Sequence, residues 1–256
     1  MGIFIISYHL NNAIMKVHIL LPQVVWKTGC GAAIIVFAAG LTTLTGCKKE
    51  STSQTEITGE RQSGFIQDNI STESQGTNNG FFWSLYREGG SASITHGSAG
   101  NFAISYSNVN DVVGGKGWNP GSARTIGYNV GALSGSYNFV GIYGWTTNPL
   151  IEFYVAEKGN VTGGTFVNNV SSDGHSYSFY KFQRVSKPSI IGTATFWQYK
   201  DTWGGAPTAQ NRSVNMANHI NNWRSRGGQG FGSYNYMILA LEAYGNKSGY
   251  INATVW

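Results

Sequence analysis

The fold of this chain is decided by two apolar segments, Pro149-Leu-Ile-Glu-Phe-Tyr-Val155 and Tyr236-Met-Ile-Leu-Ala-Leu-Glu-Ala-Tyr244. Each segment contains a single charged residue, Glu152 in the first and Glu242 in the second. Successive side chains of a β-strand point to opposite faces. Each glutamate therefore shares a face with a tyrosine two residues further on, and the opposite face of each segment is wholly apolar. We predict two strands with one face in a hydrophobic core and a lone carboxylate on the other.

Similar short segments of alternating character recur from residue 79 to residue 256 and are separated by Gly, Asn and Ser. The composition agrees with this pattern, because charged residues make up 11%, aromatic residues 14%, and 35 of the 256 residues are glycine. Many short strands at this spacing indicate an antiparallel sandwich or barrel. The expected strands are 81–86, 102–106, 125–128, 137–145, 150–157, 176–184, 193–199, 234–244 and 250–256.

One segment, 217–226, has a helical pattern instead. Ala217, Ile220 and Trp223 recur at helical spacing, and two arginines occupy the last turn before Gly227-Gly228. Basic residues suit the negative end of the helix dipole, and glycine suits a helix stop. We predict an all-β domain with a single α-helix.

The N-terminal part resembles an export signal. Lys16 and Lys27 precede an uncharged, apolar run over residues 28–47, and the run ends in Leu44-Thr-Gly-Cys47. This ending resembles a bacterial lipobox, in which the cysteine carries lipid and becomes the first mature residue. We expect a lipoprotein-type signal over 1–46, for which Met15 is an alternative start. An ordinary cleaved signal and a retained anchor remain open.

The next stretch, 47–77, is rich in Ser, Thr, Gln and Glu and nearly free of aromatic residues. Such a composition buries too little apolar surface to offset the entropy of ordering the chain. We expect a flexible Ser/Thr-rich tether there, followed by one catalytic domain over 78–256.

Several classes of function are excluded by what this domain contains. A net charge of +5, partly due to lysines of the leader, is too small and scattered for nucleic acid binding. Both cysteines, Cys30 and Cys47, precede the domain. The histidines show no metal-ligand spacing, and no Gly-x-Ser-x-Gly or phosphate-binding motif occurs. We expect no metal and no cofactor.

The carboxylates of the domain are few, and most stand beside turn-forming residues where water solvates them. Glu152 and Glu242 differ, because each stands alone in an apolar strand. Two carboxylates facing one aromatic cleft suit glycoside cleavage, which needs a nucleophile and a proton donor, about 5–5.5 Å apart for retention. The alternative is a pair of structural carboxylates hydrogen-bonded to tyrosines.

At these residues the sequence resembles the glycoside hydrolase family 11 xylanases, over essentially all of 79–256. The matching motifs are Gly115-Lys-Gly-Trp118 with Pro120-Gly-Ser, Tyr143-Gly-Trp-Thr-Thr-Asn-Pro-Leu-Ile-Glu-Phe-Tyr154, Ser172-Asp-Gly174, Pro188-Ser-Ile190, Asn218-His219 with Trp223, and Leu241-Glu-Ala-Tyr244. The resemblance implies a β-jelly roll, a sandwich of two curved antiparallel sheets around a cleft, with a hairpin thumb over the substrate.

The resemblance also implies roles for individual residues. Glu152 matches the nucleophile, and Glu242 matches the general acid/base of a retaining endo-1,4-β-xylanase. The implied substrate-binding residues are Tyr86, Tyr143, Trp145, Tyr154, Arg184, Pro188, Gln198 and Tyr236. The implied partners are xylan and xylo-oligosaccharides, and we expect a monomer that is exported and held at the membrane by a lipid on Cys47.

Asp111 stands where the family has Asn or Asp in contact with the acid/base. A second carboxylate there would share a proton with Glu242, so that the pair titrates together. Family members with Asp at this position tend to work at acidic pH, and several also have Ala after the acid/base, as Ala243 does here. We expect an acidic optimum. The alternative is a turn aspartate.

The sequence departs from the family at Tyr86, where a Trp is usual, at Ile191 in the thumb, and at Lys200-Asp-Thr-Trp203, which replaces Trp-Ser-Val-Arg. These changes affect subsite strength and thumb motion. Two other functions remain open: a β-glucan-cleaving jelly-roll glycosidase, and a non-catalytic xylan-binding protein of the cell surface.

Overall fold

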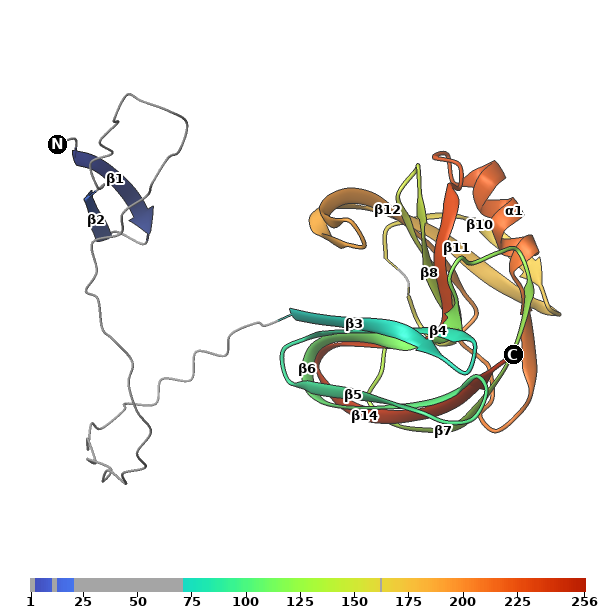
Figure 1. Cartoon of the computed structure of the whole chain (residues 1–256). Helices are drawn as coiled ribbons and strands as arrows, with labels where there is room; N and C mark the ends of the chain where they lie inside the picture. Colours follow the sequence, from blue (N-terminus) through green and yellow to red (C-terminus); the bar gives the residue numbers. More distant parts are fainter. Residues whose placement is uncertain (1–2, 11–12, 21–70, 162) are drawn as a thin grey trace, which may run out of the picture. The chain divides into compact units, whose positions relative to one another are not determined.

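The structure is a computed structural model that describes residues 3–10, 13–20, 71–161 and 163–256 (Figure 1). The chain divides into two units, of which the first ends at Gln62. In that unit β1 (Ile3–Leu10) pairs antiparallel with β2 (Ala13–Leu20). Most of the predicted signal and tether, with Cys30 and Cys47, lies outside the described residues. No helix in the described ranges is both long and apolar enough to cross a bilayer.

The second unit is a twelve-stranded sheet with one described helix, which confirms the predicted all-β jelly-roll class. Its strands are β3 (Ser71–Asn78), β4 (Phe81–Glu88), β5 (Ser91–His96), β6 (Asn101–Trp118), β7 (Thr125–Gly135), β8 (Phe139–Thr147), β9 (Ile151–Gly159), β10 (Thr165–Ser172), β11 (His175–Ser189), β12 (Gly192–Thr202), β13 (Arg212–Asn215) and β14 (Ser233–Val255). The main path through the sheet runs β10-β11-β12-β9-β8-β14-β6-β4-β3.

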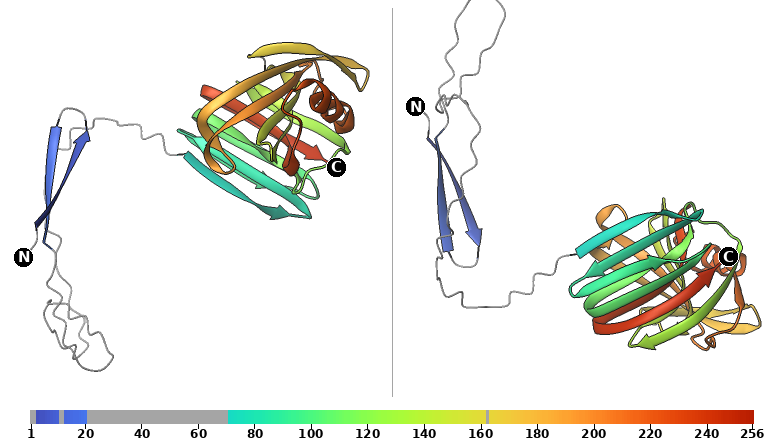
Figure 2. Two further views of the ribbon diagram at one scale, coloured as in Figure 1. Left: turned by 90° about the horizontal axis from the view of Figure 1, so that it is seen from above. Right: turned by 60° about the horizontal axis from the view of Figure 1, so that its bottom comes forward.

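Two long strands, β6 and β14, fold this sheet over on itself. The first part of β14 pairs with β8 and with the second part of β6, whereas its last part pairs with β7 and the first part of β6. Register shifts at Tyr244, Lys247 and Gly249 interrupt the ladder between the two parts, and such irregularities bend strands. The strands β6 and β14 therefore run through both layers of the sandwich and join them; Figure 2 shows the curved sheet from two further sides.

The strand alternation predicted from the sequence is present in the packing. Ile151, Phe153 and Val155 belong to the main core between the layers, together with Leu239 of β14. The alternate residues of β9 and β14, together with residues of β6, β8 and β12 and with Val161, form a second cluster on the opposite face. Its buried members are Val113, Phe139, Tyr143, Trp145, Tyr154, Ala156, Val161, Phe196, Tyr236, Ile238 and Ala240. This second face contains the pocket described below.

The helix α1 (Met216–Arg226) begins one residue before its predicted start. The side chain of Asn215 caps it by accepting a hydrogen bond from the backbone N–H of Ala217 at 3.1 Å. Its apolar side, with Ile220 and Trp223, is fully buried in the main core. The Trp223 ring lies 5.5 Å from that of Phe153, so the helix supports β9 from the side opposite the pocket.

A buried polar cluster fastens α1 to β12. Asp201 accepts a hydrogen bond from Trp223 Nε1 at 3.0 Å, and its other oxygen lies 2.6 Å from His219 Nδ1. All three side chains are fully buried. Burial raises the pKa of Asp201, while its hydrogen bonds to the helix oppose that rise. The position of Asp201 fixes the neighbouring residues of β12, which reach the pocket on the other face.

The predicted tether ends too late in the chain. Residues 71–77 were expected to be unstructured, but Ser71–Asn78 forms β3 and pairs with β4 along its whole length. The reason is that an edge strand needs only one hydrogen-bonding partner and no apolar face of its own. Three further short strands, β5, β10 and β13, were not predicted, because each has a largely exposed or intermediate side-chain pattern.

Candidate active site

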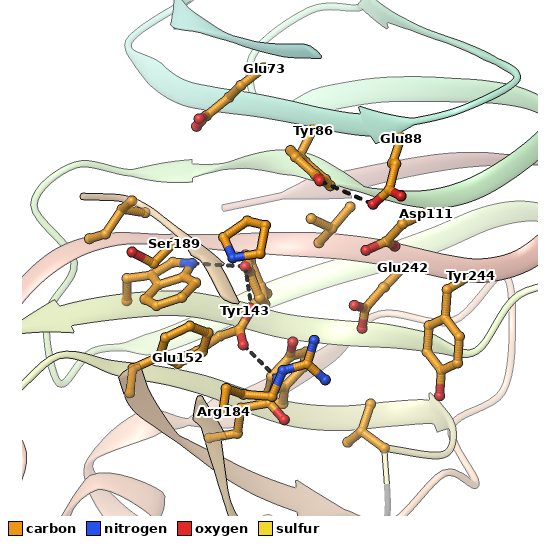
Figure 3. A pocket seen from close by; sticks show the side chains of 18 of the residues that line it. Glu73, Tyr86, Glu88, Asp111, Tyr143, Glu152, Arg184, Ser189, Glu242 and Tyr244 are labelled. Atoms are coloured by element: carbon orange, nitrogen blue, oxygen red, sulfur yellow. Dashed lines mark hydrogen bonds between the residues drawn. The ribbon is translucent and has the colours of Figure 1, made fainter. Parts of the chain in front are cut away.

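A pocket of about 410 Å³ opens on the second face of the sheet (Figure 3). All eleven residues predicted for the site within the catalytic domain line it. They come from β4 (Tyr86), β6 (Asp111), β8 (Tyr143, Trp145), β9 (Glu152, Tyr154), β11 (Arg184, Pro188), β12 (Gln198) and β14 (Tyr236, Glu242). The predicted lipidation site, Cys47, is outside the described residues.

Glu152 is fixed by hydrogen bonds to both of its carboxylate oxygens. Tyr143 donates to Oε1 at 2.8 Å, and Gln198 donates to Oε2 at 2.6 Å. Strand register places these donors, because Gln198 is the parallel partner of Glu152 on β12, and Trp145 is its antiparallel partner on β8. The Trp145 indole N–H in turn donates to the Tyr143 hydroxyl at 2.8 Å. The carboxylate therefore has one orientation in the pocket.

Two opposing effects act on the charge of Glu152, which is 8% exposed. Burial is the larger effect and raises its pKa, while the hydrogen bonds from Gln198, Tyr143 and Tyr154 limit that rise because they stabilise the ionised form. Burial and the nearby Glu152 charge also raise the pKa of Tyr143 and Tyr154, so both tyrosines stay protonated and remain donors.

Glu242 has the opposite environment. Burial, the charge of Asp111 and the charge of Glu152 raise its pKa well above the ordinary value, in that order of size, while Lys200 and Arg184 act against them. The Glu242 side chain is partly exposed and forms no hydrogen bond with a described residue. The pKa of both glutamates is raised, but only the carboxylate of Glu152 accepts hydrogen bonds that stabilise its ionised form, so Glu242 is the better candidate for the proton donor.

Asp111 lies beside Glu242 because of the register between β6 and β14. Glu242 pairs with Val113 and Tyr244 pairs with Asp111, so the two carboxyl groups are diagonal neighbours on one face. Burial, followed by the charges of Glu152 and Glu88, raises the pKa of Asp111 to about 7. Its Oδ1 atom is buried without a hydrogen-bond partner among the described residues. Asp111 and Glu242 therefore compete for protons in the same space.

Two cations partly balance this negative charge. The Arg184 guanidinium lines the pocket, and its buried Nε atom has no hydrogen-bond partner among the described residues. Lys200, which departs from the family pattern, also lines the pocket and is 8% exposed. Burial lowers the pKa of Lys200, whereas the charges of Glu152 and Glu242 act to raise it.

The sequence interpretation missed several lining residues. Lys200 and Tyr244 could have been identified from the alternation of side chains along a strand. Each lies two residues after a predicted site residue of its strand and so shares its face. Glu73 had no such signal, because it belongs to β3, which was taken for tether. Glu88 accepts a long hydrogen bond of 3.5 Å from the Tyr86 hydroxyl at the rim of the pocket.

The arrangement suits proton transfer and nucleophilic attack by side chains alone. It provides a fixed carboxylate, a carboxyl group that retains its proton, and aromatic walls such as Tyr236 that exclude water. Within the described residues, no group of three His, Cys, Asp or Glu side chains is placed to hold a metal ion.

Comparison with known proteins places the chain in a family. It is 41% identical over 177 residues to the ethylene-inducing xylanase 1 of Botryotinia fuckeliana, an alignment that covers 67% of this chain and 62% of that protein. It is 42% identical over 193 residues to the ethylene-inducing xylanase of Penicillium digitatum, which covers 73% of this chain and 87% of that protein.

A third relative is much longer. The bifunctional xylanase/xylan deacetylase of Cellvibrio japonicus is 40% identical over 190 residues, which cover 70% of this chain but 29% of that protein. The chain thus spans less than two thirds of the Botryotinia and Cellvibrio proteins. The family model of the glycosyl hydrolases family 11 matches residues 78–254, which is more than half of the chain, and the chain belongs to this family.

Proposed function

We propose that this chain is an endo-1,4-β-xylanase that hydrolyses internal β-1,4 bonds of xylan with retention of anomeric configuration. One observation carries most of the proposal. Glu152 and Glu242 line the same pocket from β9 and β14, and hydrogen bonds that stabilise the ionised form reach Glu152, whereas burial and neighbouring negative charges raise the pKa of Glu242 well above its ordinary value. The xylanase names of the family relatives support xylan as the substrate.

In the first step, a Glu152 oxygen forms a bond to the anomeric carbon while the glycosidic C–O bond breaks. The proton of Glu242 passes to the leaving oxygen. In the second step, a water oxygen attacks the same carbon, its proton passes to Glu242, and the ester to Glu152 breaks. Both residues return to their starting states.

The electrostatics support this exchange of roles. The Glu152 charge contributes to the raised pKa of Glu242, together with burial and Asp111. Esterification removes that charge, so the pKa of Glu242 falls when it must act as a base. Arg184 and Lys200 favour the ionised form of Glu242 throughout the cycle.

Export and a lipid on Cys47 are a second part of the proposal. The support is the sequence alone: a basic region, an apolar run, and Leu44-Thr-Gly-Cys47 where charge resumes. A lipid anchor with more than one acyl chain gives stable membrane attachment. The catalytic domain would then act on xylan as a monomer at the cell envelope.

Replacement of the nucleophile tests the catalytic proposal. We expect Glu152→Ala to lower the release of reducing sugar from xylan by roughly 10⁴-fold or more, because the covalent route is lost. Sodium azide should restore turnover in this variant, since a small anion fits the space that the carboxylate leaves.

Thermal unfolding of Glu152→Ala provides the control for folding. Wild-type cleavage of β-glucan faster than xylan would favour a glucanase instead. Xylan binding without hydrolysis by the wild-type protein would favour a binding protein.

Asp111→Asn tests the proton shared between Asp111 and Glu242. An amide has the shape of a protonated carboxyl and donates a hydrogen bond at every pH. The wild-type activity should fall as pH rises through the pKa of Asp111, which is about 7. Below that pH Asp111 is mostly protonated and carries little charge. The substitution therefore removes little of the negative charge that would otherwise raise the pKa of Glu242. We therefore expect the variant to have a higher pH optimum in profiles of kcat/KM, and an unchanged profile would contradict this role.

The anchor is tested in a bacterial host by Cys47→Ala. We expect the wild-type protein in the detergent-soluble membrane fraction and the variant outside it, because the variant lacks the acylated side chain. Mass spectrometry of the mature N-terminus gives an independent readout. An unmodified Cys47, or membrane attachment of both proteins, would be inconsistent with lipidation at this residue.

A further inference from the structure

Lys200 is a buried cation of the pocket wall that has no close partner of opposite charge. It lines the pocket from β12 and is 8% exposed. An ammonium group has three hydrogens to donate, but the only hydrogen bond of this one to a described residue is a long one, of 3.4 Å, to the backbone carbonyl of Gly163. Among the residues that the structure describes, no carboxylate forms an ion pair with it. Glu152 and Glu242 act on its charge only from a longer distance.

The position of Lys200 along β12 relates it to the reacting carboxylate. It follows by two residues Gln198, which donates a hydrogen bond to Glu152 at 2.6 Å. Two residues of a strand span roughly 6.5 Å. The Lys200 ammonium also lies 5.5 Å from the centroid of the Phe182 ring, a cation–π contact that holds it in place. A substrate group that contacts Lys200 therefore belongs to a sugar unit next to the one that Glu152 attacks, or to a branch on that unit.

The inner part of the pocket has an excess of positive charge in the state that starts the proposed reaction. Glu152 is then ionised and Glu242 keeps its proton. Asp111 is mostly protonated below its pKa of about 7. The two cations Arg184 and Lys200 thus face a single negative charge, and one of them is left without a counterion.

The other two carboxylates of the pocket, Glu73 and Glu88, lie on its opposite wall. They belong to β3 and β4, which are separated from β12 by β9, β8, β14 and β6 in the sheet. Figure 3 shows both residues above the carboxyl groups of Asp111 and Glu242, with Arg184 below them. Glu73 and Glu88 therefore do not supply the partner that Lys200 lacks.

A carboxylate of the substrate would supply that partner. The backbone of xylan offers only neutral oxygens, but natural xylans also carry uronic acid side groups. A neutral hydroxyl can accept a hydrogen bond from an ammonium group without offsetting its charge, and an unpaired buried charge costs much more than an unpaired neutral group. Hydrogen bonds between an ammonium group and a carboxylate are roughly twice as strong as neutral ones. The family pattern has an uncharged Trp in place of Lys200, so this cation is a departure of the present chain.

We propose that Lys200 binds the carboxylate of a uronic acid side group and so makes the enzyme selective for acidic xylan. The ammonium donates to the carboxylate oxygens, and its charge is balanced when such a side group enters the pocket. The bond-breaking steps stay with Glu152 and Glu242, and Lys200 determines which stretch of the polymer is cleaved. This inference rests on the proposed function, because it takes the polymer in the pocket to be xylan.

The test compares glucuronoxylan with the same polymer after chemical reduction of its carboxyl groups, which keeps the side groups and removes their charge. We expect the wild-type kcat/KM to be roughly tenfold higher for the acidic polymer, which corresponds to about 1.4 kcal/mol. Lys200→Met keeps an unbranched side chain of similar length without the charge, and it should cleave the two polymers equally well. The ratio within one variant cancels any effect of Lys200 on the catalytic carboxyl groups, since that effect acts on both polymers.

Two further variants serve as controls. Lys181→Met removes a lysine of β11 that makes the same two kinds of contact, a hydrogen bond of 3.2 Å to the Gly227 carbonyl and a distance of 5.8 Å to the Trp197 ring, but does not line the pocket. It should keep the wild-type preference for the acidic polymer. Lys200→Arg keeps the positive charge and should retain most of that preference. Thermal unfolding of each variant shows whether it is folded.

Equal cleavage of both polymers by the wild-type protein would overturn the inference, and this result needs no variant. A preference for the acidic polymer that persists in Lys200→Met would also overturn it, since Lys200 would then act only on the catalytic carboxyl groups or on folding. Failure of the proposed function is distinct, because the wild-type protein would then cleave neither polymer.

Discussion

The site depends on the cost of placing three carboxyl groups in one poorly solvated space. Glu152, Glu242 and Asp111 line a single pocket walled by aromatic rings. Like charges in such surroundings cannot all be ionised, and neighbouring groups must share protons. Hydrogen bonds from Tyr143 and Gln198 select Glu152 as the ionised member. The remaining proton or protons stay on Glu242 and Asp111. Double displacement needs this distribution, in which the nucleophile is ionised and the general acid is protonated.

The fold satisfies this constraint by strand register rather than by loops. Glu152 and Glu242 belong to strands that are separated by β8 alone in the sheet. Behind them, the other faces of the same strands are packed in the main core, and α1 supports β9 through the contact of Trp223 with Phe153. Side chains on well-packed strands have little freedom, so the carboxylates are held in position before substrate binds.

Much of this arrangement could be predicted from the sequence. Strict alternation around Glu152 and Glu242 gave both the core face and the pocket face, because a strand in a sandwich has only these two sides. Helix α1 was predicted to within one residue from its spacing and its terminal arginines. The long-range placement of Asp111 came from a family resemblance and not from periodicity, since it depends on pairing between β6 and β14. Composition failed at β3, where backbone pairing with β4 orders a polar segment and brings Glu73 to the pocket.

The substitution at Lys200 shows how the pocket differs from the family pattern. It adds a cation close to both glutamates and contacts the exposed Phe182 ring. The proposed mechanism depends on Glu152 attacking one face of the anomeric carbon and on water then attacking the opposite face, from which the leaving group departed. Proton NMR of freshly released xylo-oligosaccharides measures this directly. Double displacement predicts that the β-anomer appears first and the α-anomer follows by mutarotation, whereas first appearance of the α-anomer would contradict it.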